Sequence, residues 1–160
     1  METQFDNYLF LENIEIEARI KVNKETYTKI LNIFKQSNIE FLGEKTEQDE
    51  FNSNLRKRGN QFIRKEVLHK IHMNKHTDLN FSVETPIKKS DFDINNITLR
   101  RTKHRTSFRY KFWIYDFTIV NGNHYEIELE ICDVVHARRF DAKYLCNSLN
   151  MKVNDIINMF

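Results

Sequence analysis

The sequence contains little glycine, proline or cysteine, and these shortages exclude several classes of protein. Three glycines and one proline occur in 160 residues, well below the average usage of about 7% and 5%. Collagen-like sequences, flexible linkers and glycine-rich phosphate-binding loops are therefore excluded. The two cysteines, Cys132 and Cys146, are too few for a disulfide framework.

The chain also lacks long apolar runs and a large net charge of either sign. No segment approaches the roughly 20 apolar residues of a membrane helix, and the start of the chain has no secretory signal pattern. We therefore expect an intracellular protein with no membrane partner. The 25 basic and 23 acidic residues give a net charge of +2, which excludes a polycation that coats nucleic acid through bulk charge.

Hydrophobic residues make up 40% of the chain and aromatic residues 12%, which is enough for a packed core and excludes a wholly disordered chain. The length predicts a single domain over residues 1–160. Apolar and charged residues alternate strictly over 14–21, which predicts a half-buried strand. Asn23 is a plausible helix N-cap, and apolar residues at helical spacing predict a helix through about Ser37.

Most of the remaining chain has the pattern of short antiparallel strands. Residues 39–50 are acidic and predict only a short strand and a loop, whereas Gly59-Asn60 and Asn121-Gly122-Asn123 predict hairpin turns. Further strands are expected around 79–84, within 99–120 and over 125–131, and a C-terminal helix is expected within 137–160. Seven or eight such strands indicate an α+β, mainly β, fold that is either a closed antiparallel barrel or a sandwich.

Acidic residues gather at the polar positions of two predicted strands. The first strand carries Glu15 and Glu17, and the last carries Glu126, Glu128 and Glu130. Carboxylates two positions apart on a strand lie roughly 7 Å from each other and repel, which a divalent cation offsets. The alternative is that these rows are the solvated outer faces of amphipathic strands.

A basic run over residues 100–111 has the opposite character. If it forms a strand, one face carries cations and a hydroxyl group: Arg101, Lys103, Arg105, Ser107, Arg109 and Lys111. Arginine and lysine side chains of this kind bind phosphate oxygens. A solvated edge strand and a groove for a nucleic-acid backbone are the other interpretations. Together with the acidic rows, the run suggests a metal-dependent phosphoanhydride site, in a wet lumen if the strands close into a barrel.

These motifs resemble the triphosphate tunnel metalloenzymes, and within them the metal-dependent RNA triphosphatases of mRNA capping in fungi, protozoa and large DNA viruses. The matching segments are Glu15-Ile16-Glu17-Ala18-Arg19, Lys103-His104-Arg105-Thr106-Ser107-Phe108, Asp116-Phe117-Thr118 and His124-Tyr125-Glu126-Ile127-Glu128-Leu129-Glu130, with weaker matches at Arg64-Lys65 and Ser82-Val83-Glu84. Arginine at the end of the first motif favours the RNA-processing branch. Ile114 departs from relatives that carry an arginine there, so that one phosphate contact is either missing or supplied by Arg109 or Lys111.

The resemblance implies a closed barrel of about eight strands that forms a charged tunnel. It implies that Glu15, Glu17 and Glu130 bind Mg²⁺ or Mn²⁺. The catalytic residues that it implies are Glu15, Glu17, Arg64, Lys65, Glu84, Lys103, Arg105, Asp116, Glu126, Glu128 and Glu130. The further substrate-binding residues that it implies are Arg19, Arg56, Arg101, Ser107, Arg109 and Thr118.

The activity implied is hydrolysis of the γ-phosphate of triphosphate-ended RNA by water, without a covalent enzyme intermediate. A guanylyltransferase would be the capping partner, and the cytoplasm, the nucleus, a viral factory or a virion would be the location. The alternatives are a hydrolase of tripolyphosphate or nucleoside triphosphates with the same fold, and a non-catalytic barrel that binds RNA or a triphosphate.

Two further patterns are weaker candidates for function. Cys132 and Arg138 have the Cys-x5-Arg spacing of cysteine phosphatases, but the intervening loop has no glycine that would let backbone amides surround an anion. His69, His72 and His76 have a spacing that would suit a metal site on a helix, but the segment has the pattern of a strand and a loop.

Overall fold

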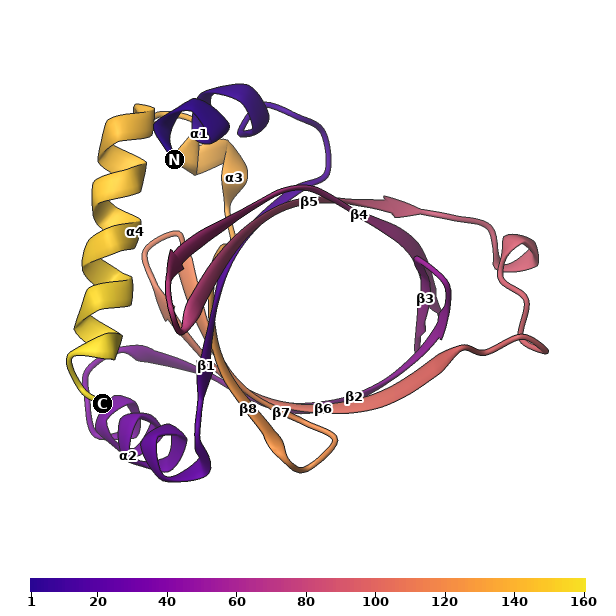
Figure 1. The fold of residues 1–160 in the computed structure, drawn as a ribbon, viewed down its shortest axis with the longest axis horizontal. Coiled ribbons are helices and arrows are strands. Elements are labelled where there is room, and N and C mark those ends of the chain that lie inside the picture. The colour runs from indigo at the N-terminus through magenta and orange to yellow at the C-terminus, as the bar shows by residue number, and fades with distance from the viewer.

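A computed structural model describes all of residues 1–160, and its eight strands form one closed antiparallel barrel (Figure 1). The strands are β1 (Ile14–Val22), β2 (Glu40–Asn52), β3 (Leu55–Arg58), β4 (Gln61–Asn74), β5 (Thr77–Pro86), β6 (Leu99–Tyr110), β7 (Trp113–Val120) and β8 (His124–Ile131). Their order around the barrel is β1-β5-β4-β3-β2-β6-β7-β8. The predicted α+β, mainly β, fold is confirmed, and the sandwich is excluded.

Four α-helices accompany the barrel: α1 (Glu2–Tyr8), α2 (Lys24–Lys35), α3 (Val134–Ala137) and α4 (Ala142–Ile157). The predicted N-cap of α2 is confirmed, because Asn23 Oδ1 accepts a hydrogen bond from Thr26 N at 2.8 Å. Asp141 caps α4 in the same way, with Tyr144 N as the donor at 2.7 Å. The short helices α1 and α3 were not expected from the sequence. None of the helices has the length and apolar character needed to cross a membrane.

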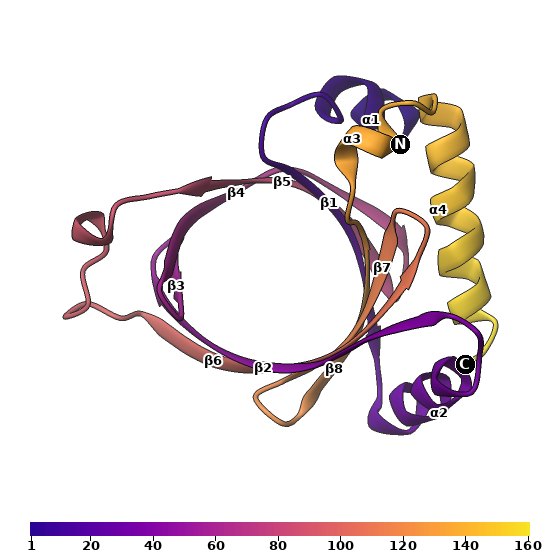
Figure 2. The same ribbon diagram turned by 180° about the vertical axis from the view of Figure 1, so that it is seen from behind.

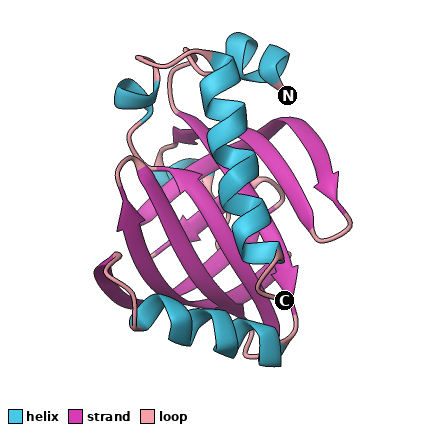
Figure 3. Ribbon diagram, turned by 90° about the vertical axis from the view of Figure 1, so that its left-hand side faces the viewer, coloured by secondary structure: helices cyan, strands magenta, loops and turns pink.

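The hydrophobic core lies outside the barrel, between the sheet and the helices. The outward side chains of β1, Ile16, Ala18 and Ile20, are at most 1% exposed. They share one apolar cluster with residues of α1, α2 and α4, including Phe34 and Leu149. Figure 3 shows α4 lying along the outer face of the sheet with α2 across its end. Because the apolar faces point outward here, the polar faces of the same strands point into the lumen.

The far side of the barrel, formed by β2, β3 and β4, is not covered by an α-helix (Figures 1 and 2). Here β2 is a continuous strand of 13 residues, so the prediction of a short strand and a loop over residues 39–50 was wrong. The outer face of this strand carries exposed polar residues such as Glu44, Thr46 and Gln48. Without an apolar face, the strand has no amphipathic alternation in its sequence.

The predicted basic ladder on β6 is shorter than the run of basic residues. β6 ends at Tyr110, and Lys111 lies in the turn to β7 with a φ of 55°. Its side chain therefore does not continue the row that includes Arg101, Lys103 and Arg105.

Candidate active site in the barrel lumen

The acidic rows from the two ends of the chain lie side by side in the lumen. β1 pairs with β8, so that Glu17 lies opposite Glu130 and Arg19 lies opposite Glu128. Directly paired residues of antiparallel strands project to the same face of the sheet. The opposite face of β1 packs against the helices, so all of these charged side chains project inward.

Arg19 lies among three of the glutamates. Its Nη2 donates hydrogen bonds to Glu17 Oε1 at 3.0 Å and to Glu128 Oε2 at 3.4 Å, and its Nε lies 3.4 Å from Glu126 Oε2. Burial lowers the pKa of Arg19, but the surrounding carboxylates outweigh burial and raise it above its usual value. Thr118 Oγ1 donates a further hydrogen bond of 2.7 Å to Glu128. These contacts fix the middle of the acidic cluster.

A second ion-pair group connects β1, β3, β4 and β5. Lys65 Nζ donates a hydrogen bond to Glu15 Oε1 at 2.8 Å and lies 3.7 Å from Glu84 Oε1. Arg56, which is 8% exposed, approaches the other oxygen of Glu84 at 3.7 Å. Burial raises the pKa of Glu15, but the charge of Lys65 together with the hydrogen bonds of Lys65 and Glu84 lowers the pKa below its usual value. The structure therefore places two predicted cations beside two predicted carboxylates.

The inward row of β6 supplies the main group of cations. Lys103 is 3% exposed, and this burial, opposed by the charge of Glu128, lowers its pKa to about 8. Arg105 Nη1 donates to Glu47 Oε1 at 3.3 Å. Ser107 donates a hydrogen bond from its hydroxyl group to Asp116, which lies opposite it on β7.

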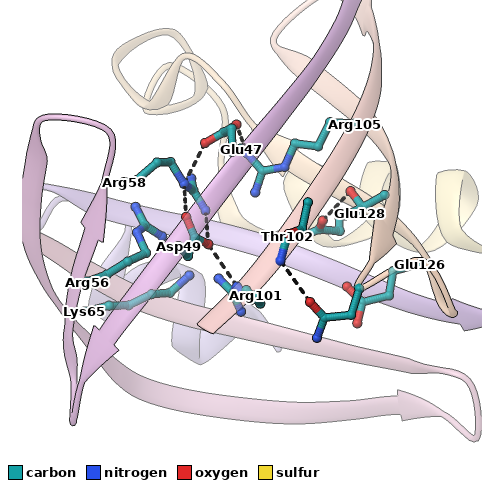
Figure 4. Close-up of polar contacts among 12 residues, drawn as sticks. Glu47, Asp49, Arg56, Arg58, Lys65, Arg101, Thr102, Arg105, Glu126 and Glu128 are labelled. Atoms are coloured by element: carbon teal, nitrogen blue, oxygen red, sulfur yellow. Dashed lines mark hydrogen bonds and ion pairs between the residues drawn. The ribbon is translucent and has the colours of Figure 1, made fainter. Parts of the chain in front are cut away.

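Figure 4 shows that the lumen contains three charged residues the sequence analysis missed, Glu47, Asp49 and Arg58. Arg58 donates from Nε and Nη2 to the two oxygens of Asp49 at 2.6 and 2.8 Å, and Arg101 Nε donates to Asp49 Oδ2 at 2.9 Å. Burial raises the pKa of Asp49, but the two arginines outweigh it and lower the pKa to about 2. The segment Glu47-Gln48-Asp49 has an acidic residue at every second position, as the acidic rows of β1 and β8 do, and this pattern could have indicated two of the three residues.

Two predicted site residues lie at the margin of the lumen or outside it. Arg64 is exposed and pairs with Thr85, whereas its neighbour Lys65 pairs with Glu84. Because successive residues of a strand alternate between faces, Arg64 points away from the lumen, and the predicted catalytic role does not fit its position. Arg109 projects toward the lumen but is exposed at the end of β6, opposite Ile114.

The environment between β1 and β8 disfavours the ionised form of two carboxyl groups. Burial, together with the charge of Glu128, raises the pKa of Glu17 well above its usual value. Burial, together with Glu15, Asp116 and Glu128, raises the pKa of Glu130 to about 8. Such oxygen donors are the ligands that Mg²⁺ and Mn²⁺ prefer, so the donor chemistry fits a hard divalent cation.

The positions of the Glu15 and Glu17 carboxylates are set by ion pairs and not by a shared metal site. No three histidine, cysteine, aspartate or glutamate side chains of the chain converge as a preformed metal site. Glu15 and Glu17 instead contact Lys65 and Arg19. Both carboxylates are therefore held by cationic side chains rather than arranged around a common point.

The cysteine-phosphatase pattern is not assembled. Arg138 Nε and Nη2 donate hydrogen bonds to the carbonyl oxygens of Leu9 and Leu11, at 3.0 and 3.2 Å. Burial raises the pKa of the Cys132 thiol, which is opposite to what a nucleophilic cysteine requires.

The three histidines also form no cluster. His69 stacks on Tyr8, His72 pairs with Asp78, and His76 lies against Phe160.

Known proteins match this chain in fold but not in sequence. No family model matches the sequence, and no curated protein matches it. The RNA triphosphatase Pct1 of S. pombe, solved in complex with the Spt5 CTD, has a TM-score of 0.71 at 13% identity over 99% of this chain and 89% of its own. The triphosphatase of the Mimivirus capping enzyme has a TM-score of 0.70 at 14% identity, over 98% of this chain and 94% of its own. The resemblance seen in the sequence is confirmed at the level of the fold: the chain has the tunnel-forming eight-stranded barrel that these RNA triphosphatases share.

Proposed function

We propose that the protein is a metal-dependent RNA 5′-triphosphatase, which releases the γ-phosphate of triphosphate-ended RNA in the first step of mRNA capping. One observation carries the proposal: a single lumen holds the carboxylates of β1 and β8 beside the cations of β4 and β6, in a barrel shared with RNA triphosphatases. Carboxylates that attract a metal ion and cations that attract a polyphosphate are the two requirements of such a reaction.

The cations of the lumen would bind the triphosphate. Arg56 and Arg105 each have a buried Nε without a hydrogen-bond partner, and the Nε of Arg19 has none either. A buried donor without a partner costs free energy unless an acceptor arrives. Phosphate oxygens are suitable acceptors, since arginine binds them with parallel hydrogen bonds. Lys65 on β4 and Lys103 on β6 add point charges on the two flanks of the acidic rows.

In this proposal Glu15, Glu17 and Glu130 hold Mg²⁺ or Mn²⁺. The bound ion would supply charge neutralisation for the γ-phosphate oxygens and so favour the approach of a nucleophile. The pairing of Glu17 with Glu130 on adjacent strands places two of the three ligands on neighbouring positions.

The remaining side chains would position the attacking water. Burial raises the pKa of Glu128, but Lys103 and Arg19 outweigh it and keep the pKa far below its usual value, so this carboxylate is ionised and accepts hydrogen bonds. Together with Glu126 it would orient a water molecule in line with the scissile bond. The water oxygen bonds to the γ-phosphorus as the bond to the β,γ-bridging oxygen breaks, and diphosphate-ended RNA and phosphate leave. Most of the rate enhancement then comes from positioning and electrostatic stabilisation.

The test is phosphate release from triphosphate-ended RNA, tripolyphosphate and a nucleoside triphosphate, each with Mg²⁺, Mn²⁺ or a chelator. Metal-dependent release from RNA is the expected result. Release from tripolyphosphate or the nucleotide alone would assign the site to the small-molecule hydrolases of this fold. No release under any condition would favour a non-catalytic barrel, which the ion pairs of Glu15 and Glu17 with Lys65 and Arg19 would suit.

A pair of charge-removing variants separates catalysis from folding. Glu15→Ala should abolish metal-dependent release while leaving the thermal transition in place. Glu66→Ala is the matched control, because Glu66 is exposed and points outward beside Lys65. Full activity of the Glu15→Ala variant would refute the assignment. A guanylyltransferase that accepts the diphosphate end would be the functional partner.

A further inference from the structure

An aromatic pocket of about 510 Å³ lies outside the barrel, between α4 and the turn from β6 to β7. Five of its lining side chains are aromatic: Tyr110, Phe112, Trp113, Tyr115 and Tyr144. Two of these, Tyr110 and Tyr144, are 46% and 45% exposed. Their rings are therefore accessible, and they come from different elements on the two sides of the pocket.

Two lysines lie over these rings without carboxylate partners. Lys111 Nζ is 5.4 Å from the centre of the Tyr110 ring, and Lys152 Nζ is 5.6 Å from Tyr110 and 5.3 Å from Trp113. Neither takes part in any ion pair of the chain. Lys152 donates only to Ser148 Oγ, at 2.9 Å. Asp155 is the one acidic residue that lines the pocket, so the lining has an excess of positive charge.

The pocket adjoins one mouth of the tunnel through Arg109. This residue directly precedes Tyr110, and its Nε donates a hydrogen bond to the carbonyl oxygen of Lys111 at 2.9 Å. Arg109 pairs with Ile114 on β7, and Ile114 in turn pairs with Glu130 on β8. A chain that leaves the lumen beside Glu130 therefore passes a cation before it reaches the aromatic rings.

We infer that this pocket binds the 5′ segment of single-stranded RNA: a base stacks on Tyr110, from which Lys111 and Lys152 turn to the backbone phosphates, or on the face of Tyr144 that does not stack on Phe140. Accessible aromatic rings combined with cations are the usual means of binding single strands without sequence preference. An apolar peptide would pack against the aromatic rings but would provide no anion for the two lysines. The RNA identity of the occupant rests on the proposed function, whereas the anionic and aromatic character of the site does not.

The first test measures binding without the triphosphate. The probe is a fluorescent single-stranded RNA with a 5′-hydroxyl end, and its affinity is measured by anisotropy at two salt concentrations. Tyr110→Ala and Tyr144→Ala should each weaken binding about five-fold or more, which is the low end of the contribution of one stacked base. Lys152→Gln should weaken binding and reduce its dependence on salt concentration, because one phosphate contact is lost. Lys143→Gln is the matched control, since Lys143 is exposed on the same helix but does not line the pocket.

The second test separates this inference from the catalytic proposal. In the pocket variants the KM for triphosphate-ended RNA should rise while the kcat and KM for tripolyphosphate stay unchanged. Unchanged RNA affinity in all three variants would overturn the inference, as would an equal loss with tripolyphosphate. If the wild-type protein released no phosphate at all but its RNA affinity still depended on the pocket, only the catalytic proposal would fail.

Discussion

Glu17 and Glu130 lie directly opposite each other on the paired strands β1 and β8, with both side chains directed into the lumen. Arg19 holds Glu17 through a 3.0 Å hydrogen bond, but Glu130 forms none of the ion pairs of the lumen. Like charges directly opposite each other on a sheet destabilise it. A bound divalent cation would remove this repulsion, and the apparent stability of the protein would then depend on the metal concentration.

We therefore expect Mn²⁺ to raise the melting temperature of the wild-type protein and not that of a Glu130→Gln variant. A ligand at 100 times its Kd adds about 2.7 kcal/mol, which corresponds to roughly 5–10 °C for a domain of this size. Without metal the variant should melt close to the wild-type temperature at pH 7, where Glu130 with its pKa of about 8 is largely protonated, and above it at higher pH, where a repulsive charge is removed. Thermal melts with Mn²⁺ and with chelator give the comparison, and Glu66→Gln is the surface control. Equal metal-induced shifts in wild type and the Glu130→Gln variant would remove Glu130 from the metal site.

Asp49 is expected to stabilise the uncovered side of the barrel in a pH-dependent way. Its side chain accepts hydrogen bonds from Arg58 and Arg101, and these cations outweigh burial and lower its pKa to about 2. Since the unfolded value is about 3.9, the stabilisation is complete above about pH 4 and is lost as the pH falls toward 2. Asp49→Asn should reduce the free energy of unfolding at pH 7 by about 1–3 kcal/mol, because it removes charged hydrogen bonds from two partly buried arginines, of which Arg58 keeps Glu47 as a partner at 2.6 Å.

The measurement is urea unfolding of wild type and the Asp49→Asn variant at several pH values. The difference between the two should be constant from pH 7 to about pH 4 and should shrink below it. A difference that grows as the pH falls would contradict the proposed ion pairing.

The side of the barrel that is covered by helices could be predicted from the sequence. Strands β1 and β8 bury one face against α2 and α4, so apolar and charged residues alternate strictly along them. Pairing of these strands then places their charged faces together, which is why Glu17, Arg19 and Glu128 were found without a structure. The pattern and the site have the same physical origin in a sheet with one apolar face and one wet face.

The uncovered side could not be predicted in this way. The outer face of β2 meets solvent and its inner face meets the lumen, so both faces are polar and the period of two is not visible as hydropathy. Glu47 and Asp49 consequently fell in a segment for which only a short strand and a loop were predicted. The error at Arg64 has a related cause, because two adjacent cations on β4 do not show which one faces inward. Only the register with β5, where Lys65 pairs with Glu84, decides it.

That register yields a direct prediction for adjacent residues. Lys65→Gln removes a cation that contacts Glu15 at 2.8 Å and should lower phosphate release at least ten-fold, as expected for one lost electrostatic contact in an active site. Arg64→Gln changes the outer, solvated face of the same strand and should leave turnover within about two-fold of wild type, since exposed charges contribute little. Steady-state kinetics with triphosphate-ended RNA measure both. A larger loss from Arg64→Gln than from Lys65→Gln would show that the register of β4 is wrong.

The segment from Cys132 to Arg138 is expected to have a structural role. Arg138 donates to the carbonyl oxygens of Leu9 and Leu11 and so ties the segment before β1 to the region after β8. Arg138→Ala should lower the free energy of unfolding by about 1–3 kcal/mol through the lost hydrogen bonds, with little change in kcat for the folded fraction.

Cys132→Ser should leave both stability and metal-dependent phosphate release near wild-type values, because the thiol has a raised pKa and no cation donates to it. Denaturant unfolding and phosphate release, measured on the same preparations, distinguish the two residues. Loss of turnover in the Cys132→Ser variant at unchanged stability would restore the cysteine-phosphatase mechanism and exclude hydrolysis by water in the lumen.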